Sequence, residues 1–351
     1  MCLAVVLASF LIPFVLTMRK PRIKLERPET FYHVMTRTSQ CVSNLEITRD
    51  PQIKAICDRI IRQMAAIYHV EIYAWVLMDN HFHLCLSVNK PPMEEADIAS
   101  RFESLQEINV HKREWYPWLL GKFYHRFCDL SWFMWEIKTR IARAFNQRHN
   151  TSGFFWGGRF KSKVIEDEAA LLRVMTYIEQ NPVRAGLCEK PSQFPFCSAG
   201  RAQDQLQQNQ PTGIPAVGPF RVLHGHERAR AYVDWMDYQA DLILNPERRI
   251  GCPPKTIANF CLNRQILEEW RRDFQNGGPS NWSNQGYGSQ SFEMEMREAE
   301  DARILELANQ RYFVSRMKGT HCKPKASFSL NGSEPWWYQN QSNHSQHPKK
   351  D

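Results

Sequence analysis

Two histidines separated by one residue, His81 and His83, are the part of this sequence whose types and spacing point most directly to chemistry. They follow the turn-forming pair Asp79-Asn80 and open an apolar run to Leu86, which is typical of a β-strand. Because successive side chains of a strand point to opposite faces of the sheet, both imidazoles share one face and Phe82 points to the other. Such a pair makes half of a metal site. The remaining ligand must come from another part of the chain.

The stretch from Leu171 to Pro182 provides polar groups that could complete such a site. Its apolar residues recur at the spacing of an amphipathic helix, and the proline ends the helix near residue 180. Tyr177 falls on the side opposite the apolar residues and shares that side with Gln180 and Asn181. The pattern therefore does not predict a core tyrosine.

These groups need a scaffold, and the order of elements predicts one. Strands are expected at 30–37, 71–78 and 81–88, with a fourth entered from a turn within 154–165. Helices are expected at 51–68, 131–148 and 167–180, the first with Asp50 as N-cap and Pro51 in its first turn. The order β-α-β-β-α-β-α predicts an α+β fold, with a ferredoxin-like antiparallel sheet, helices on one face and one extra helix.

The chain divides into segments of different character. Residues 1–17 are almost wholly apolar, and the basic start at Met18 suggests that translation begins there. Residues 18–200 form the core domain. A Gln/Pro/Gly-rich linker is expected at 201–225, a helical extension at 226–320 and a disordered tail at 321–351.

Composition sets only broad limits. The 351 residues carry a formal net charge of +8, which fits a polyanion-binding protein without requiring one. The ten cysteines include no Cys-x-x-Cys pair, so we expect a reducing, cytoplasmic environment and no disulfide framework.

Five motifs together resemble a known family. They are Phe31-Tyr32-His33-Val34-Met35-Thr36-Arg37, Leu77-Met78-Asp79-Asn80-His81-Phe82-His83-Leu84, Phe145-Asn146-Gln147-Arg148-His149-Asn150, Phe155-Trp156-Gly157-Gly158-Arg159-Phe160-Lys161-Ser162 and Tyr177-Ile178-Glu179-Gln180-Asn181-Pro182-Val183-Arg184-Ala185-Gly186. In order and spacing they resemble the single-tyrosine HUH transposases of insertion sequences (the insertion-sequence-200 type), and within them the REP-associated tyrosine transposases. The resemblance covers about residues 18–196 and does not reach the C-terminal half.

The resemblance implies an HUH nuclease core and a transposase activity. Such enzymes cleave and rejoin single-stranded DNA beside hairpins or palindromic repeats through a 5′-phosphotyrosine intermediate. It implies that Tyr177 is the nucleophile and that His81 and His83 hold a divalent cation, Mg²⁺ or Mn²⁺, with Asn181 or Gln180 as third ligand. Asn181 resembles the REP-associated branch more closely. Imidazole ligands suit Mn²⁺ at least as well as Mg²⁺. Relatives act as monomers or homodimers, and no membrane partner is expected.

Basic residues near the fourth strand could contact the DNA backbone. Arg159, Lys161 and Lys163 alternate in sequence, which would place them on one face of that strand along a track of phosphates. Arg37, near the end of the first strand, could extend this track. Taken alone, the three basic residues are more typical of a solvated strand face.

Two other functions compete with the enzyme. One is a catalytically silent hairpin-binding protein that keeps the fold, against which the presence of both histidines and the tyrosine argues. The other is a structural zinc site made of His81, His83 and Cys85. Three ligands on one strand cannot surround a tetrahedral ion, so this ranks last. His33 we interpret as a structural residue.

Overall fold

The computed structural model describes residues 22–40, 50–109 and 112–244, together with residues 286–287 and parts of 291–302. The expectations for residues 1–17, for most of the extension beyond 244 and for the tail at 321–351 lie outside the described residues.

A mixed five-stranded sheet forms the centre of the described chain. Its strands run in the spatial order β2-β3-β1-β4-β5, and all neighbouring pairs are antiparallel except β4 and β5. The strands are β1 (Glu29–Arg37), β2 (Val70–Leu77), β3 (His81–Asn89), β4 (Lys161–Ile165) and the short β5 (Gly286–Tyr287). The first four have the predicted ferredoxin-like order, and the α+β class is confirmed.

Two of the helices, α3 and α7, begin at aspartate caps that the sequence supplies. Asp50 accepts a hydrogen bond from the backbone N–H of Gln52, and Asp167 accepts one from that of Ala170, each at 2.8 Å. The helices are α3 (Pro51–Ile67), α4 (Glu95–Glu107), α5 (Leu120–Phe127), α6 (Leu130–His149), α7 (Glu168–Glu179), α8 (Asn181–Arg184), α9 (Ser198–Gln207) and α10 (Gly225–Leu244). Helices α4 and α5 fill the insertion between β3 and α6.

Helices cover both faces of the sheet, whereas the sequence predicted one. Helices α3 and α6 cover the face to which Phe82 points. On this face Val34, Leu84 and Leu86 belong to the first apolar cluster. Helices α7, α9 and α10 cover the opposite face, where Val76 and Cys85 belong to a second cluster. The nearly continuous apolar run of β3 therefore reflects burial on both faces.

The segment 201–225 differs from the linker predicted for it. Residues up to Gln207 belong to α9, and several apolar residues that follow are buried in the second cluster, namely Ile214, Val217, Phe220 and Leu223. Its Gln- and Pro-rich composition indicated an exposed chain, but these apolar residues anchor it beside α7. The core domain and the start of the extension thus share one apolar cluster.

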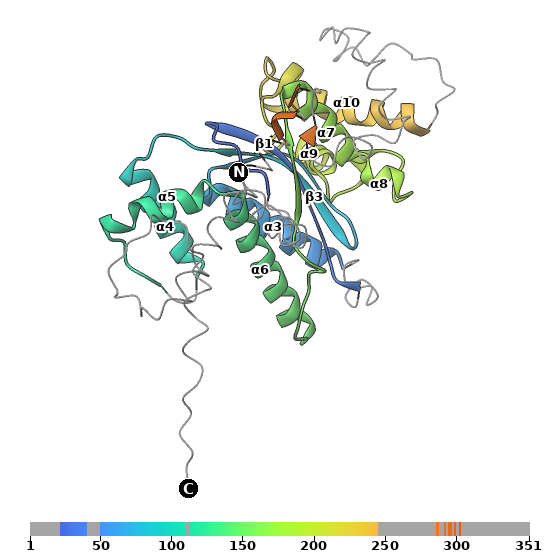
Figure 1. Cartoon of the computed structure of the whole chain (residues 1–351). Helices are drawn as coiled ribbons and strands as arrows, with labels where there is room; N and C mark the ends of the chain where they lie inside the picture. Colours follow the sequence, from blue (N-terminus) through green and yellow to red (C-terminus); the bar gives the residue numbers. More distant parts are fainter. Residues whose placement is uncertain are drawn as a thin grey trace, which may run out of the picture.

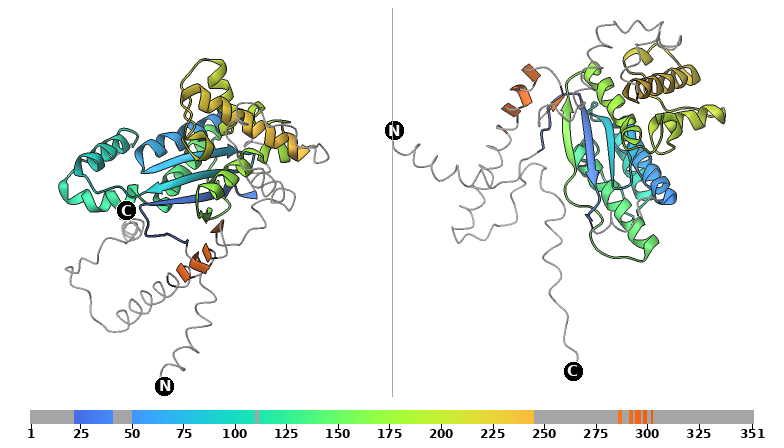
Figure 2. Two further views of the ribbon diagram at one scale, coloured as in Figure 1. Left: turned by 90° about the horizontal axis from the view of Figure 1, so that it is seen from above. Right: turned by 90° about the vertical axis from the view of Figure 1, so that its right-hand side faces the viewer.

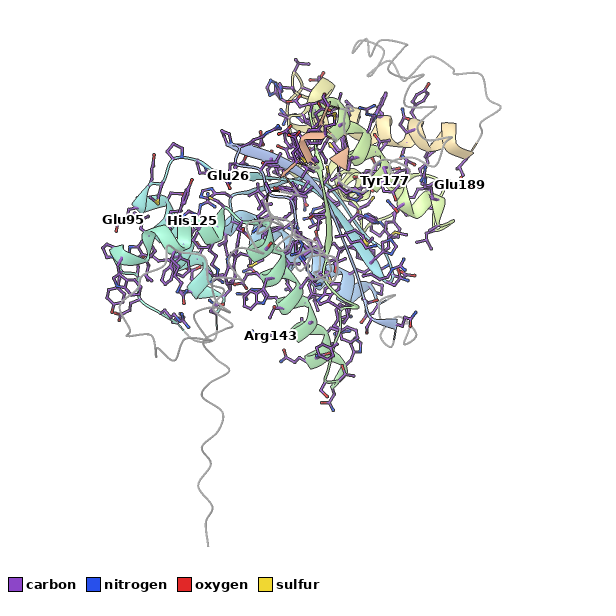
Figure 3. All side chains as sticks on the ribbon, viewed as in Figure 1. Glu26, Glu95, His125, Arg143, Tyr177 and Glu189 are labelled. Atoms are coloured by element: carbon purple, nitrogen blue, oxygen red, sulfur yellow. The ribbon has the colours of Figure 1, made fainter. Side chains whose placement is uncertain are left out.

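Helices α4 and α5 lie away from α9 and α10, near a different part of the sheet. Figure 1 and the left view of Figure 2 show α4 and α5 together, well separated from α9 and α10. Figure 3 gives the same separation for labelled side chains, with His125 of α5 far from Tyr177 of α7. Among the described residues, every helix is too short or too polar to cross a membrane.

Candidate functional site

The two histidines of the His-x-His motif lie on the face of the sheet that α7 covers. His81 pairs with Arg37 and His83 with Met35 across the antiparallel β1–β3 ladder. The ring centroids of His81 and His83 are 5.1 Å apart, with their planes at 85°. His83 is buried, whereas His81 is partly exposed. One imidazole thus sits inside the protein and the other at its edge.

A third imidazole, His33 of β1, joins this pair. Its Nε2 lies 2.8 Å from His83 Nδ1, and the two rings stack at a centroid distance of 5.0 Å. His33 is 8% exposed and His83 6%. The residue pattern led us to interpret His33 as structural, and it does not predict this contact. Only the β1–β3 register, which pairs His33 with Cys85, brings it to the same face.

The surroundings of all three imidazoles favour the neutral ring. Burial, together with the positive charge of Lys163, lowers the pKa of His33 to about 3. Burial likewise lowers the pKa of His81 to about 4, with Arg37 adding to the effect. The pKa of His83 falls well below its ordinary value, first because of burial and then because of the neighbouring His33. Neutral rings are the form that can ligate a cation.

Tyr177 on α7 faces the buried imidazoles. Its ring centroid is 5.9 Å from that of His33 and 6.1 Å from that of His83, edge to face in both cases. The apolar side of α7 is buried in the second cluster, which leaves Tyr177 half-buried over the histidines. The guanidinium carbon of Arg184 lies 5.4 Å from the centre of the Tyr177 ring. No role was predicted for Arg184, although it lies within the quoted motif.

The structure separates the two residues proposed as third ligand. Gln180 is fully buried, and its Nε2 donates a 2.8 Å hydrogen bond to the backbone oxygen of Met236 on α10. Asn181 is partly exposed one helical turn after Tyr177, and its Nδ2 donates to the backbone oxygens of Tyr177 and Ile178. In both amides the bonded atom is the nitrogen, and the buried Gln180 Oε1 has no hydrogen-bond partner among the described residues. The two residues differ in exposure, because Gln180 is enclosed against α10 whereas Asn181 is partly exposed.

The nitrogens of the histidine pair fit a cation site. His81 Nδ1 donates to Asn80 Oδ1 at 2.7 Å, and His83 Nδ1 is engaged by His33. Ligating histidines are usually held in this way through the ring nitrogen that does not bind the metal. Within the described ranges, no three His, Cys, Asp or Glu side chains converge as a metal site. A cation held by His81 and His83 would therefore need a third ligand of another type.

The zinc alternative is not supported by the surroundings of Cys85. Its side chain is fully buried within the second apolar cluster, and burial raises the pKa of the thiol well above its ordinary value. A thiol must lose its proton to bind zinc. Cys85 packs as a small apolar residue.

Basic side chains lie on the same sheet face as the histidines. The β1–β4 register pairs His33 with Lys163 and Met35 with Lys161, so both lysines share the face of His33. Arg37, opposite His81, is exposed. Arg159 is also exposed but lies two residues before β4, so strand alternation does not determine where its side chain points.

Helix α7 is held by the segments that follow it in the chain. Glu179, fully buried, accepts hydrogen bonds from the Tyr232 hydroxyl at 2.7 Å and from the backbone N–H of Ala199 at 3.2 Å. Burial raises the pKa of Glu179, although these hydrogen bonds oppose the shift. Together with the Gln180–Met236 bond, they join α7 to both α9 and α10.

Comparison with known proteins gives one structural similarity. The chain is similar to a solved REP-associated tyrosine transposase bound to a REP hairpin, with 19% sequence identity and a TM-score of 0.34. The match covers 54% of this chain and 87% of the other. No protein-family model and no curated protein matches the chain.

Proposed function

We propose that this chain is a REP-associated tyrosine transposase, a metal-dependent enzyme that cleaves and rejoins single-stranded DNA beside hairpins. The observation that carries the proposal is the position of Tyr177, whose ring lies edge to face against His83 and His33 on the covered face of the sheet. A phenol next to a neutral imidazole pair is suited to attack on a phosphodiester held there. The preference for hairpins comes from the family that the five motifs resemble.

The proposed cleavage exchanges bonds and one proton between Tyr177 and the DNA strand only. Tyr177 Oη bonds to phosphorus while the bond from phosphorus to the 3′ oxygen breaks, and the phenol proton ends on that oxygen as a 3′-hydroxyl. The product is a 5′-phosphotyrosine. Attack on it by the 3′-hydroxyl of another DNA end reverses these changes and rejoins the strand without an external energy source.

The surrounding residues have distinct parts in this proposal. His81, His83 and Asn181 would hold the divalent cation, which when bound polarises a non-bridging phosphate oxygen as a Lewis acid. Arg184 brings positive charge beside Tyr177, where negative charge gathers on the transferring phosphate. Arg37, Lys161 and Lys163 would contact phosphates along the strand, and we assign Arg159 to the same track from its sequence.

Covalent capture of labelled DNA tests this proposal. Full-length protein, Mn²⁺ and a 3′-labelled single strand carrying a hairpin should give a labelled adduct that survives denaturing electrophoresis, whereas the same strand labelled at its 5′ end should give only a shortened free fragment. Tyr177→Phe and His81→Ala should give none, and a chelator should abolish it, while hairpin affinity changes only a few-fold because phosphate contacts supply most of the binding. Tyr116→Phe, at an exposed tyrosine of the insertion, is the matched control and should react normally.

The outcomes separate the proposal from its rival. A wild-type protein that binds hairpins tightly but forms no adduct with Mn²⁺ is the catalytically silent binding protein. An adduct formed by Tyr177→Phe would assign the chemistry to another residue.

A further inference from the structure

The contact between His33 and His83 has a direction, and that direction decides whether His83 can bind a cation. A neutral imidazole carries one N–H and one lone pair. Between His33 Nε2 and His83 Nδ1, 2.8 Å apart, one nitrogen donates and the other accepts. If His33 donated, the single proton of His83 would lie on its Nε2 and no lone pair would remain for a cation.

We propose that His33 is a positioning residue for His83: its Nε2 accepts the Nδ1–H of His83, which leaves the Nε2 lone pair of His83 free for a divalent cation. The inference deepens the proposed function and rests on it, because it concerns the ligands of that cation. It assigns a role in the site to a residue of β1, a strand to which only DNA contacts were assigned.

Three features of the site support this role. Both rings are almost fully buried, so water cannot replace the partner of His83 Nδ1. The β1–β3 ladder sets the separation of the two rings, because it pairs His33 with Cys85 and Met35 with His83. At His81 the corresponding nitrogen, Nδ1, is already held by Asn80 Oδ1, an atom that only accepts. With His33 as acceptor, the two histidines have the same tautomer.

The direct test is the tautomer in metal-free, full-length protein. Long-range ¹H–¹⁵N spectra of protein labelled with ¹⁵N-histidine distinguish a protonated Nδ1 from a protonated Nε2, and the His83 signals are identified by their loss in His83→Asn. We expect His83 to carry its proton on Nδ1. A proton on His83 Nε2 overturns the proposal, whatever the variants below do.

Metal affinity provides a second readout that does not depend on cleavage. We expect His33→Leu to weaken Mn²⁺ binding, followed by electron paramagnetic resonance of the free ion, about 10–100-fold, the usual loss for an outer partner of a ligand. His33→Gln keeps an acceptor oxygen and should recover most of that loss. Cys85→Ala, which removes a buried side chain opposite His33 on the same face, controls for packing and should bind Mn²⁺ normally.

The results separate this inference from the proposed function. Folded His33→Leu with unchanged Mn²⁺ affinity, or a Gln variant as weak as the Leu variant, overturns the positioning role even if cleavage is found. Weakened Mn²⁺ binding in His33→Leu, with recovery in His33→Gln, supports the role even if the protein never cuts DNA.

Discussion

The hydroxyl of Tyr232 on α10 donates a 2.7 Å hydrogen bond to Glu179, two residues beyond Tyr177 on α7. Both partners are fully buried. The bond connects the helix that carries the proposed nucleophile to the extension, a part of the chain without any catalytic motif. Stability measurements on this contact therefore also report how firmly Tyr177 is held.

Removing the Tyr232 hydroxyl should destabilise the protein. Tyr232→Phe leaves a buried carboxyl without one of its donors, and we expect a loss of about 1.5–3 kcal/mol in the free energy of unfolding, measured by urea denaturation. Tyr116→Phe is the matched control, because the Tyr116 hydroxyl also bonds a glutamate but at the surface, and it should leave stability unchanged. Equal losses of unfolding free energy in the two variants would contradict a stabilising role for the buried Tyr232–Glu179 hydrogen bond.

The raised pKa of Glu179 predicts a dependence of stability on pH. Burial favours the neutral acid in the folded protein, so its contribution is fully present below the unfolded pKa near 4.5 and is lost as pH rises through the folded pKa. Glu179→Gln is neutral throughout and lacks this dependence. The free energy of unfolding of the wild type, minus that of Glu179→Gln, should therefore fall as pH rises from about 4.5. A difference that is constant with pH, or that increases, would show that the pKa is not raised.

Substitutions at Asn181 and Gln180 should affect different properties, metal binding in the first case and stability in the second. Asn181→Ala should weaken Mn²⁺ binding at least about tenfold with little loss of stability. Gln180→Ala leaves the Met236 carbonyl without its side-chain donor, so it should cost about 1–3 kcal/mol of stability and leave Mn²⁺ affinity unchanged. Calorimetric titration and urea denaturation of the same preparations give both values. Weakened metal binding only in Gln180→Ala would reverse the assignment.

Arg37 should contribute to DNA binding through charge. Removing one phosphate contact to a single strand lowers the slope of log affinity against log salt concentration by about 0.7, and we expect this change for Arg37→Ala. Lys122→Ala, at an exposed lysine of α5, should keep the wild-type slope. Fluorescence anisotropy of a labelled hairpin at several salt concentrations measures both, and an unchanged slope for Arg37→Ala would exclude Arg37 from the phosphate track.

Local patterns predicted the scaffold and one side of the site. Strand alternation was enough to place His81 and His83 on one face, and helical spacing was enough to turn Tyr177 away from the apolar side of α7. The contact of His83 with His33 could not be predicted from these patterns, because it depends on the register of two strands that are distant in sequence. Gln180 and Asn181 are adjacent residues, and only the packing of α10 against α7 distinguishes them. Helix α10 begins at Gly225, the last residue of the stretch that composition marked as a linker.

The attachment of α7 to α9 and α10 has a kinetic consequence. Tyr177 and the imidazoles belong to one chain, and buried hydrogen bonds hold α7 in place, so in the proposed reaction the phenol would meet a bound phosphate at a fixed effective concentration, independent of how dilute the protein is. The loss of entropy on bringing the proposed nucleophile and ligands together would then occur during folding. Residues 197–239 would thus contribute to the local concentration of the proposed nucleophile.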